Sequence, residues 1–299
     1  MSNILEVKGL SKDYALMKKN PEPDAFALKD VTFSVPKGFI MGLAGPNGAG
    51  KTTALKLILQ IRKRDAGTIQ MFGRDISESS KQNDMVGVVL DTPNFPHEWR
   101  LTQVEQGLRP FYKSWDSAKF AESLENFELS PKKTVMELSR GMQVKLQIAI
   151  AISHNAKFLV LDEPTGGLDP VARDEVCEIM QEFVEDGEKS VLFSTHITSD
   201  LEKIADYVTM ILKGKIHYTG TKDHLLDRYA RITGGADDIT EAHIEKIIGY
   251  RKHGAGFEGL LKVSDKPFMP SSVLTEAPTL EDIIVFINKE SKKEAKKDA

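Results

Sequence analysis

The feature that most constrains the fold is a short apolar run, Phe39 to Ala44, that ends in a glycine-rich loop. The loop, Gly45-Pro46-Asn47-Gly48-Ala49-Gly50-Lys51-Thr52, fits the pattern G-x-x-x-x-G-K-[ST] and lies between a predicted strand and a predicted helix. Its glycines let successive backbone N–H groups converge on phosphate oxygens, and the helix N-terminus adds positive potential. Together with Thr53, these residues are the predicted nucleotide-binding loop, which we call the P-loop. We expect Lys51 to reach the β- and γ-phosphates and to assist catalysis, and the Thr52 hydroxyl to bind Mg²⁺.

Two carboxylates follow a second apolar run, Phe158 to Leu161. This run predicts a buried strand whose last residues stand at the carboxyl edge of the sheet, where ligands of such folds bind. We expect Asp162 to hold Mg²⁺, directly or through water, and Glu163 to polarise the water that attacks the γ-phosphate. The alternative is a strand that simply ends in exposed charge.

His196 follows the next predicted strand, Val191 to Ser194, and should emerge at the same edge of the sheet. A lone histidine is more often structural than catalytic, so its predicted catalytic role depends on the neighbouring carboxylates. Ser199 and Glu202 fit a capping box, which would start the following helix, Ser199 to Tyr207, and fix His196 just before it.

Strands and helices alternate after Phe158, which implies a mostly parallel sheet with crossover helices. Earlier in the chain, a helical region is predicted over Leu101 to Leu129 and a helix over Met142 to Ser153. Further strands are predicted at Ile4 to Leu10, Val31 to Val35, Ala66 to Phe72, Val86 to Leu90, Val208 to Leu212 and Lys215 to Tyr218.

Composition excludes several classes of protein. The net charge of −4 over 299 residues argues against a nucleic-acid-binding protein, which usually carries a basic face. The single cysteine, Cys177, excludes a disulfide framework and favours a reducing, cytosolic setting. The longest apolar runs, such as Leu146 to Ile152, fall far short of the roughly 20 residues that span a bilayer. If the protein works at a membrane, another chain provides the spanning part.

Two further segments make the pattern specific. Leu138-Ser139-Arg140-Gly141-Met142 lies between the two nucleotide motifs and resembles the signature LSGGQ of ABC ATPases. Pro164 to Pro170 is similar to the D-loop of that family, and these two names are kept below. Tyr14 occupies the place of the aromatic side chain that stacks on adenine, and Phe26 is a second candidate. The chain is thus identified as a member of the ABC family over residues 4 to about 218.

The resemblance implies an α/β fold. A RecA-like P-loop NTPase core with a mostly parallel sheet would join an antiparallel β subdomain and an α-helical signature subdomain over about residues 95–153. We expect the ATPase domain over residues 1–221, a small C-terminal subdomain over 222–288 and a charged tail over 289–299. The lysines of the tail predict a disordered, solvated end or, alternatively, a contact with anionic lipid headgroups.

The resemblance also implies a mechanism. Two copies, or this chain and a paralogous ATPase, would pack head to tail so that the P-loop of one and Ser139 and Gly141 of the other enclose each ATP. Hydrolysis, with ATP and Mg²⁺ as the expected ligands, would open the dimer. The implied partner is a separately encoded transmembrane permease subunit, bound at the cytoplasmic face of the cell membrane. No nucleic acid is expected as a partner.

Several positions depart from the family pattern. Asp91 stands where the Q-loop of the family usually has glutamine. We expect Asp91 to be a ligand of the metal ion, and the alternative is a loop carboxylate that faces solvent. Arg140 and Met142 replace the first glycine and the glutamine of the signature. Arg140 could add a cation near the γ-phosphate, but we expect its side chain to turn outward. Gly166 makes the D-loop more flexible.

These departures are typical of bacterial exporter ATPases that pair with small membrane subunits. Phe111 to Asp116, Thr195 to Asp206 and Pro278 to Asp282 resemble a subgroup that includes exporters of toxic or antimicrobial peptides. The predicted function is therefore the ATP-hydrolysing motor of an exporter, with a peptide or amphipathic cargo. The alternative is a soluble ABC ATPase acting on nucleic acid or ribosomes. Against this alternative, the residues between Lys51 and Asp162 contain no heptad run that would form a long coiled coil, and the sequence shows one cassette rather than two in tandem. An importer ATPase is less consistent with the departures.

Five aromatic residues lie close together after Asp91, namely Phe95, Trp99, Phe111, Tyr112 and Trp115. Aromatic residues at such density usually build a local core. The alternative is a groove that receives an amphipathic coupling helix of the membrane subunit. Both can hold at once.

Overall fold

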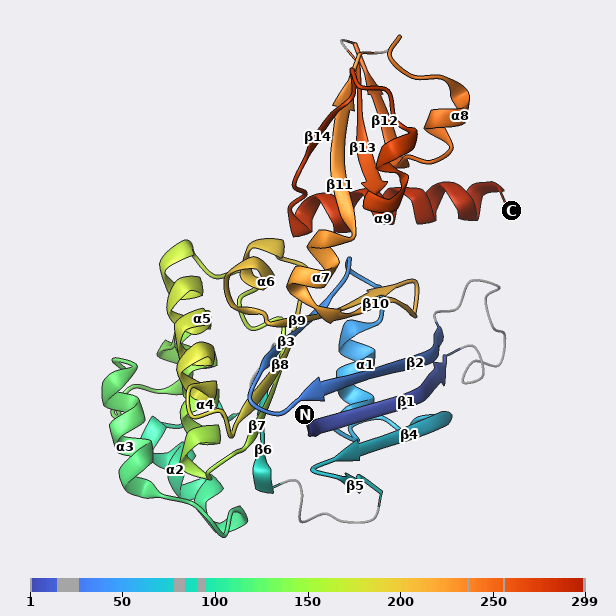
Figure 1. Ribbon diagram of the computed structural model, residues 1–299. Helices are drawn as coiled ribbons and strands as arrows, with labels where there is room; N and C mark the ends of the chain where they lie inside the picture. Colours follow the sequence, from blue (N-terminus) through green and yellow to red (C-terminus); the bar gives the residue numbers. More distant parts are fainter. Residues whose placement is uncertain are drawn as a thin grey trace. The chain divides into compact units, whose positions relative to one another are not determined.

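The computed structural model describes residues 2–14, 27–77, 84–90, 95–235, 237–254 and 256–297. Two positions of interest, Phe26 and Asp91, lie outside these described residues. The chain divides into two compact units, Met1–Thr219 (unit 1) and Gly220–Ala299 (unit 2). Figure 1 labels the helices and strands of both.

A largely parallel sheet forms the centre of unit 1. Within the described residues it has six strands in the order β10-β9-β3-β8-β7-β6. Strands β3, β6, β7, β8 and β9 pair in parallel, as the alternation of strands and helices predicts. Strands β3, β7 and β8 are buried along their whole length, which accounts for their short, largely apolar sequences. The bounds are β3 Ile40–Ala44, β6 Val86–Val89, β7 Phe158–Asp162, β8 Ser190–Thr195, β9 Tyr207–Leu212 and β10 Lys215–Thr221.

An antiparallel sheet packs against the central sheet through a shared core. Its strand order is β2-β1-β4-β5, with β1 Asn3–Asp13, β2 Ala27–Pro36, β4 Ala66–Met71 and β5 Arg74–Asp75. The shared core joins Val7 of β1 to Leu55 of helix α1 (Lys51–Ile58) and to Val160 of β7. Helix α1 is therefore held by both sheets, which fixes the P-loop at its N-terminus.

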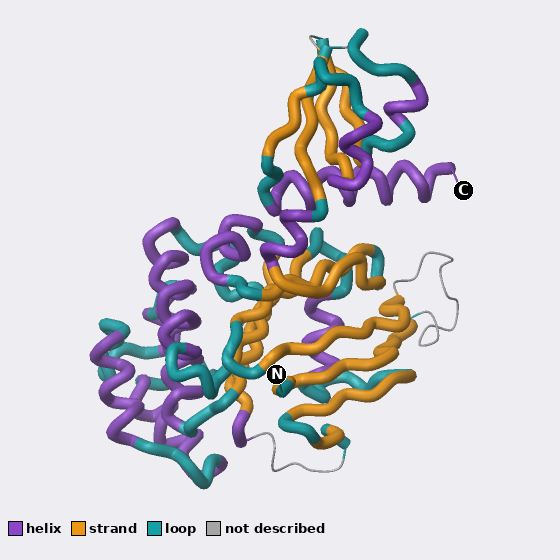
Figure 2. The backbone as a smooth tube through the Cα atoms, in the orientation of Figure 1, coloured by secondary structure: helices purple, strands orange, loops and turns teal. Residues whose placement is uncertain are grey.

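The helices of unit 1 other than α1 include a bundle with its own core. Figure 2 shows α2 to α5 on the side of the central sheet away from the antiparallel sheet. Leu101, Val104, Phe120 and Leu146 are fully or almost fully buried in this second core. The bounds are α2 Leu101–Leu108, η3 Arg109–Phe111, α3 Ser117–Asn126, η4 Val135–Glu137, α4 Arg140–Ser153, α5 Pro170–Val184 and α6 Thr198–Ile204.

The predicted helical region Leu101 to Leu129 is broken in the structure. Helix α2 ends at Leu108, and the 3₁₀ turn η3 contains Pro110. Proline has no N–H to continue an α-helix, so the chain turns here before α3 begins at Ser117.

The aromatic residues after Asp91 divide into two groups. Phe95 and Trp115 pack against the second core, and the Tyr112 ring lies 6.1 Å from that of Trp115. Phe111 is 77% exposed and Trp99 is 36% exposed. The expected local core is therefore present, and part of the aromatic surface stays outside it.

Helix α6 corrects the prediction for the segment after His196. The helix covers Thr198–Ile204, and its N-cap, Ile197, makes no side-chain capping bond. Ser199 therefore lies inside the first turn, and the predicted capping box with Glu202 is wrong. Tyr207, placed in this helix by its sequence pattern, begins β9 instead.

Unit 2 is built on an antiparallel sheet in the order β12-β13-β11-β14. Helix α9 lies against β12 and β13 and buries Leu280, Ile283, Phe286 and Ile287. Because α9 runs to Lys297, the expected disordered tail over 289–299 is wrong for its described part. The bounds are α7 Lys222–Asp227, β11 Tyr229–Gly234, α8 Glu241–Ile244, β12 Ile248–His253, β13 Gly256–Lys262, η5 Val263–Phe268, β14 Leu274–Glu276 and α9 Leu280–Lys297.

Among the described helices of the chain, none has the length and apolar character needed to cross a membrane.

Candidate functional site

The P-loop joins β3 to α1 in a conformation that requires its glycines. Gly50 is the N-cap of α1 and has a φ of 114°, in the left-handed region that favours glycine. A Cβ atom at Gly45 would lie 2.3 Å from the carbonyl oxygen of Ile211 on β9. The loop therefore fits tightly against the sheet on one side and opens at the N-terminus of α1 on the other.

Lys51 is the first residue of α1 and is 5% exposed. Its Nζ donates to the Gly45 carbonyl oxygen at 2.7 Å and lies 3.1 Å from Glu163 Oε1. The ammonium is thus oriented by oxygen atoms within the P-loop and the adjacent carboxylate. Phosphate oxygens offer the same kind of acceptor, so the position suits the predicted contact with a nucleotide.

Asp162, at the end of β7, is buried and faces the P-loop. Its Oδ1 accepts hydrogen bonds from Thr52 Oγ1 at 3.0 Å and from Ser194 Oγ at 2.7 Å. The Ser194 hydroxyl also accepts from the Glu163 N–H at 3.0 Å. A carboxylate beside a hydroxyl provides the hard oxygen ligands that Mg²⁺ prefers, so these residues fit the metal.

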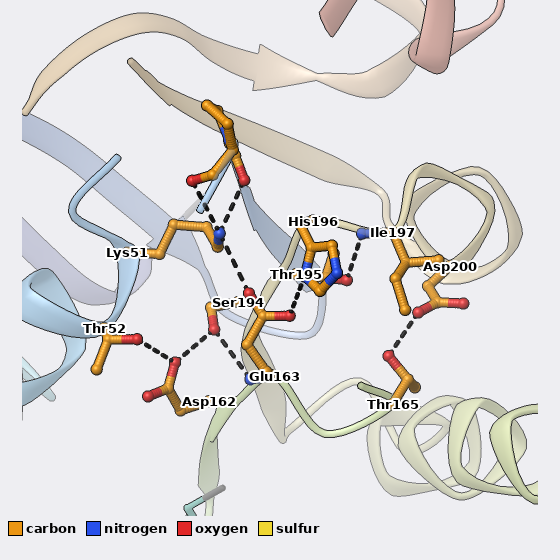
Figure 3. Close-up of polar contacts among 12 residues, drawn as sticks. Lys51, Thr52, Asp162, Glu163, Thr165, Ser194, Thr195, His196, Ile197 and Asp200 are labelled. Carbon is orange, nitrogen blue, oxygen red and sulfur yellow. Dashed lines mark hydrogen bonds and ion pairs between the residues drawn. The ribbon is translucent and has the colours of Figure 1, made fainter. Parts of the chain in front are cut away.

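Glu163 lies between Lys51 and His196 (Figure 3). Its Oε2 is 2.7 Å from His196 Nδ1. Because an ionised carboxylate only accepts hydrogen bonds, this contact places the imidazole proton on Nδ1. The backbone of Glu163 has a φ of 50°, in the left-handed region that a residue with a side chain rarely adopts. The strained turn directs the carboxylate away from the strand and toward the lysine and the histidine.

These groups share one cleft of about 1040 Å³. It brings together the predicted residues Asn47, Gly48, Ala49, Gly50, Lys51, Thr52, Thr53, Asp162, Glu163 and His196. Gly45 and Pro46 contribute carbonyl oxygens to Lys51 from beneath the loop. Tyr14, Ser139 and Gly141 do not line this cleft of their own chain. Tyr14 is the last described residue before the gap at 15–26, and Lys12 Nζ lies 6.0 Å from the centre of its ring.

The signature starts helix α4. Ser139 is its N-cap, and its hydroxyl accepts from the Met142 N–H at 3.3 Å. Gly141 is buried, and a Cβ atom there would lie 3.1 Å from the Ala172 side chain on α5. The glycine thus lets α4 and α5 approach each other closely.

Arg140 lies on the side of the cleft, which was the alternative to the expected outward position. Its side chain is exposed, but it does not turn away from the site, because it lines the same cleft as Lys51. A Cβ atom at Gly166 would lie 3.7 Å from Arg140 Nη2, and one at Gly167 would lie 3.8 Å from Arg140 Cδ. Arg140 therefore lies beside the D-loop glycines of its own chain.

Two structural contributors were missed by the sequence analysis. Ser194 links Asp162 to Glu163, and its only signal was its place at the end of a predicted strand. Gln147 on α4 accepts from the Leu90 N–H at 3.0 Å and donates to the Leu90 carbonyl oxygen at 3.2 Å. The residue just before Asp91 is thereby fixed to the helix that carries the signature. No sequence pattern indicates a contact between residues so far apart.

The site combines a largely parallel sheet, a glycine-rich loop whose carbonyl oxygens contact Lys51, and a buried Asp162 beside Thr52. These features define a P-loop nucleotide-binding protein. The sequence profile of the ABC transporter family matches residues 28–166. The bacitracin transport ATP-binding protein BcrA of Enterococcus faecalis is 31% identical over 272 residues, which cover 89% of this chain and 85% of the relative. The chain belongs to the ABC transporter family.

Two further comparisons agree with this membership. The lantibiotic transport ATP-binding protein SrtF of Streptococcus pyogenes is 30% identical, with 71% of this chain and 89% of the relative covered. The solved structure of an ATP-binding subunit of an ABC transporter has a TM-score of 0.64 at 28% identity and covers 74% of this chain and 91% of its own. The predicted fold class, the ATP-binding and ATPase activity and the resemblance to peptide-antibiotic transport ATPases are confirmed.

Proposed function

We propose that this chain is the ATP-hydrolysing motor of an exporter whose cargo is a peptide or another amphipathic molecule. The observation that carries the catalytic part of this proposal is the position of Glu163 between Lys51 and His196 in the P-loop cleft. The support for the cargo comes from the relatives, which are named for bacitracin and lantibiotic transport.

The residues of the cleft divide the chemical work. Lys51 and the N–H groups of the P-loop bind and orient the β- and γ-phosphates. Thr52 and Asp162 would hold Mg²⁺, with Asp91 as a further candidate; when bound with the nucleotide, the ion neutralises charge on the phosphate oxygens. Glu163 accepts the proton of the attacking water, and His196 holds the Glu163 carboxylate through its Nδ1–H.

The second half of the nucleotide site would come from a second chain. Ser139 and Gly141 do not line the cleft of their own chain, so a contact with its nucleotide requires another copy or a paralogous ATPase. A head-to-tail dimer provides this contact at both sites at once. Tyr14 remains the proposed stacking partner of adenine.

A transmembrane permease subunit is the proposed partner of this dimer, which would place the chain at the cytoplasmic face of the cell membrane. The described helices offer no membrane span. The exposed aromatic side chains of Phe111 and Trp99 offer an apolar surface for a helix of that partner.

The catalytic assignment is tested with Glu163→Gln. We expect ATP binding to persist and kcat to fall by at least about 100-fold, because the amide cannot take the proton of the attacking water. The measurements are steady-state phosphate release and binding of a fluorescent ATP analogue. Glu188→Gln is the matched control, because Glu188 also pairs with a lysine, Lys37, at an exposed position of unit 1. Turnover above a tenth of the original rate in Glu163→Gln would show that another group is the base.

The cargo assignment needs the complex of this chain with its membrane subunit. In vesicles, we expect a cationic amphipathic peptide to stimulate ATP hydrolysis by the complex and to be moved across the bilayer. Glu163→Gln in the same complex should abolish both effects. A complex that hydrolyses ATP normally but neither responds to such peptides nor moves them would rule out the proposed cargo while leaving the catalytic assignment intact.

A further inference from the structure

A buried hydrogen bond joins the D-loop to helix α6 beside the catalytic groups. Thr165 Oγ1 donates to Asp200 Oδ2 at 2.5 Å. Thr165 is 0% exposed and Asp200 is 2% exposed. Figure 3 shows this pair on the far side of His196 from Lys51. Thr165 belongs to the D-loop, but neither Thr165 nor Asp200 lines the cleft.

This bond connects the same two segments that carry Glu163 and His196. Thr165 lies just after Glu163 at the end of β7, and Asp200 lies in the helix that follows His196. The Glu163–His196 contact is partly exposed, whereas the Thr165–Asp200 contact is enclosed by protein. A buried contact restricts its partners more than an exposed one, because water does not compete for its donors and acceptors. The buried pair is therefore suited to set the spacing of the exposed pair.

Asp200 also faces the first turn of α5, where the D-loop ends. Arg173 Nε lies 4.0 Å from Asp200 Oδ1. Within the described residues this buried Nε has no hydrogen-bond partner. One carboxylate thus faces a residue at each end of the D-loop, Thr165 at its start and Arg173 just beyond its end.

Keeping a carboxylate at this position has a cost. Burial raises the pKa of Asp200, and the Thr165 hydroxyl and the Arg173 guanidinium act in the opposite direction. A well-packed apolar residue would avoid this cost of desolvation. The buried carboxylate is therefore weak evidence for a role in stability alone.

We propose that Asp200 is a positioning residue for ATP hydrolysis, which acts through Thr165 to hold the D-loop and thereby the Glu163 carboxylate against His196. The inference rests on the proposed roles of Glu163 and His196. Glu163 has a left-handed backbone, which persists only where the surrounding structure holds it in place. The Thr165–Asp200 bond provides such a restraint close to the strained residue.

The first test is Thr165→Val, which keeps the shape of the side chain and removes the hydroxyl donor. We expect kcat to fall about 10-fold with KM for ATP unchanged, because misplacement of a catalytic group affects turnover rather than binding. Thr165→Ser restores the donor and should return kcat to within about twofold of the original. Asp200→Ala removes the acceptor of the same bond, so Thr165→Val combined with it should be no slower than Asp200→Ala alone.

The decisive measurement repeats Thr165→Val in a His196→Ala background. If the buried bond acts by holding Glu163 against His196, its loss should cost nothing further once the imidazole is gone. If the bond only supports the fold, the two losses in kcat should multiply. Multiplied losses would overturn the inference, and so would a Thr165→Val enzyme with full turnover. Should Asp200→Ala fail to fold, the Thr165 variants still decide the question.

A control separates this effect from the general loss of a buried hydroxyl. Thr209 is 0% exposed, and its Oγ1 lies 2.9 Å from Thr219 Oγ1, away from the cleft. Thr209→Val should leave kcat unchanged. A His196→Ala enzyme with full turnover would refute the proposed role of His196 and this inference with it. A slow His196→Ala enzyme beside a fully active Thr165→Val enzyme would refute this inference alone.

Discussion

His154, the C-cap residue of helix α4, is almost fully buried. Its Nδ1 lies 3.0 Å from the Asp84 carbonyl oxygen, and its ring stacks on Tyr112 at 4.2 Å between centroids. Burial lowers the pKa of His154 below its ordinary value of 6.5, although the Asp84 carbonyl and carboxylate act against this shift. The unfolded chain therefore binds a proton at this residue more readily than the folded protein does.

The sign of this difference predicts a loss of stability in weak acid. Well above pH 6.5 the imidazole is neutral in both states, so the contribution of His154 to the free energy of unfolding is fully present. As the pH falls below 6.5, the unfolded state gains the proton first and this contribution is lost. We expect the melting temperature of the original protein to fall between pH 7 and pH 5 more steeply than that of His154→Gln. The measurement is thermal denaturation at a series of pH values. His97→Gln, at an exposed position, should keep the original slope, and an unchanged slope in His154→Gln would contradict the assignment.

Sequence motifs predicted most of the residues that line the cleft, but they did not predict the residues that surround and support it. Lys51, Thr52, Asp162 and Glu163 belong to local patterns whose chemistry depends on neighbours in sequence, so spacing was sufficient to place them. The direction of Arg140 was not predicted because its side chain lies beside the D-loop, more than 20 residues further along the chain. Asp200 lies in a segment that carries the family resemblance, but its contacts could not be predicted, because its partners Thr165 and Arg173 lie outside helix α6.

Among the elements, α6 shows why boundaries are harder to predict than the elements themselves. A Cβ atom at Gly42 on β3 would lie 2.0 Å from Leu201 Cδ2, so the helix sits where only glycine leaves room. The Ser199–Glu202 pattern fits a capping box locally, but the contacts of Asp200 and Leu201 set the position of the helix instead. Tertiary packing thus outweighed the local signal.

Two other errors, the unbroken helix after Leu101 and the disordered C-terminal tail, could have been avoided from the sequence. Pro110 marks the break between α2 and α3, since proline disfavours the interior of a helix. In α9, the apolar residues Leu280, Ile283 and Ile287 recur at helical spacing. That periodicity outweighs the lysines at the end of the chain, which dominated the prediction of disorder. The central strands were predicted well because a fully buried strand gives a short apolar run.

At the scale of the whole molecule, the chain has two units with separate cores. The core of unit 2 contains Ile232, Phe257 and Leu261, whereas the nucleotide cleft lies wholly within unit 1. Ligand binding stabilises the part of a protein that must be folded to bind it, by about 2.7 kcal/mol at a ligand concentration 100 times Kd.

This arrangement predicts that ATP protects the two units unequally. With Mg²⁺ and a slowly hydrolysed ATP analogue, we expect amide hydrogen exchange to slow in α1 and at the end of β7, and to stay unchanged in β11 and β13. Lys51→Ala should show no protection in either unit, because the phosphates lose their main cation. Equal protection of both units by the analogue would show that they unfold as one.

The left-handed backbone of Glu163 affects how this position can evolve. Asparagine and glycine adopt this conformation with less strain than glutamate does, yet neither could take the proposed role of Glu163 as the base. On the proposed role of Glu163, Glu163→Asn or Glu163→Gly would relieve backbone strain and abolish ATP turnover together. Selection for stability alone would then act against this carboxylate, and selection for turnover would retain it.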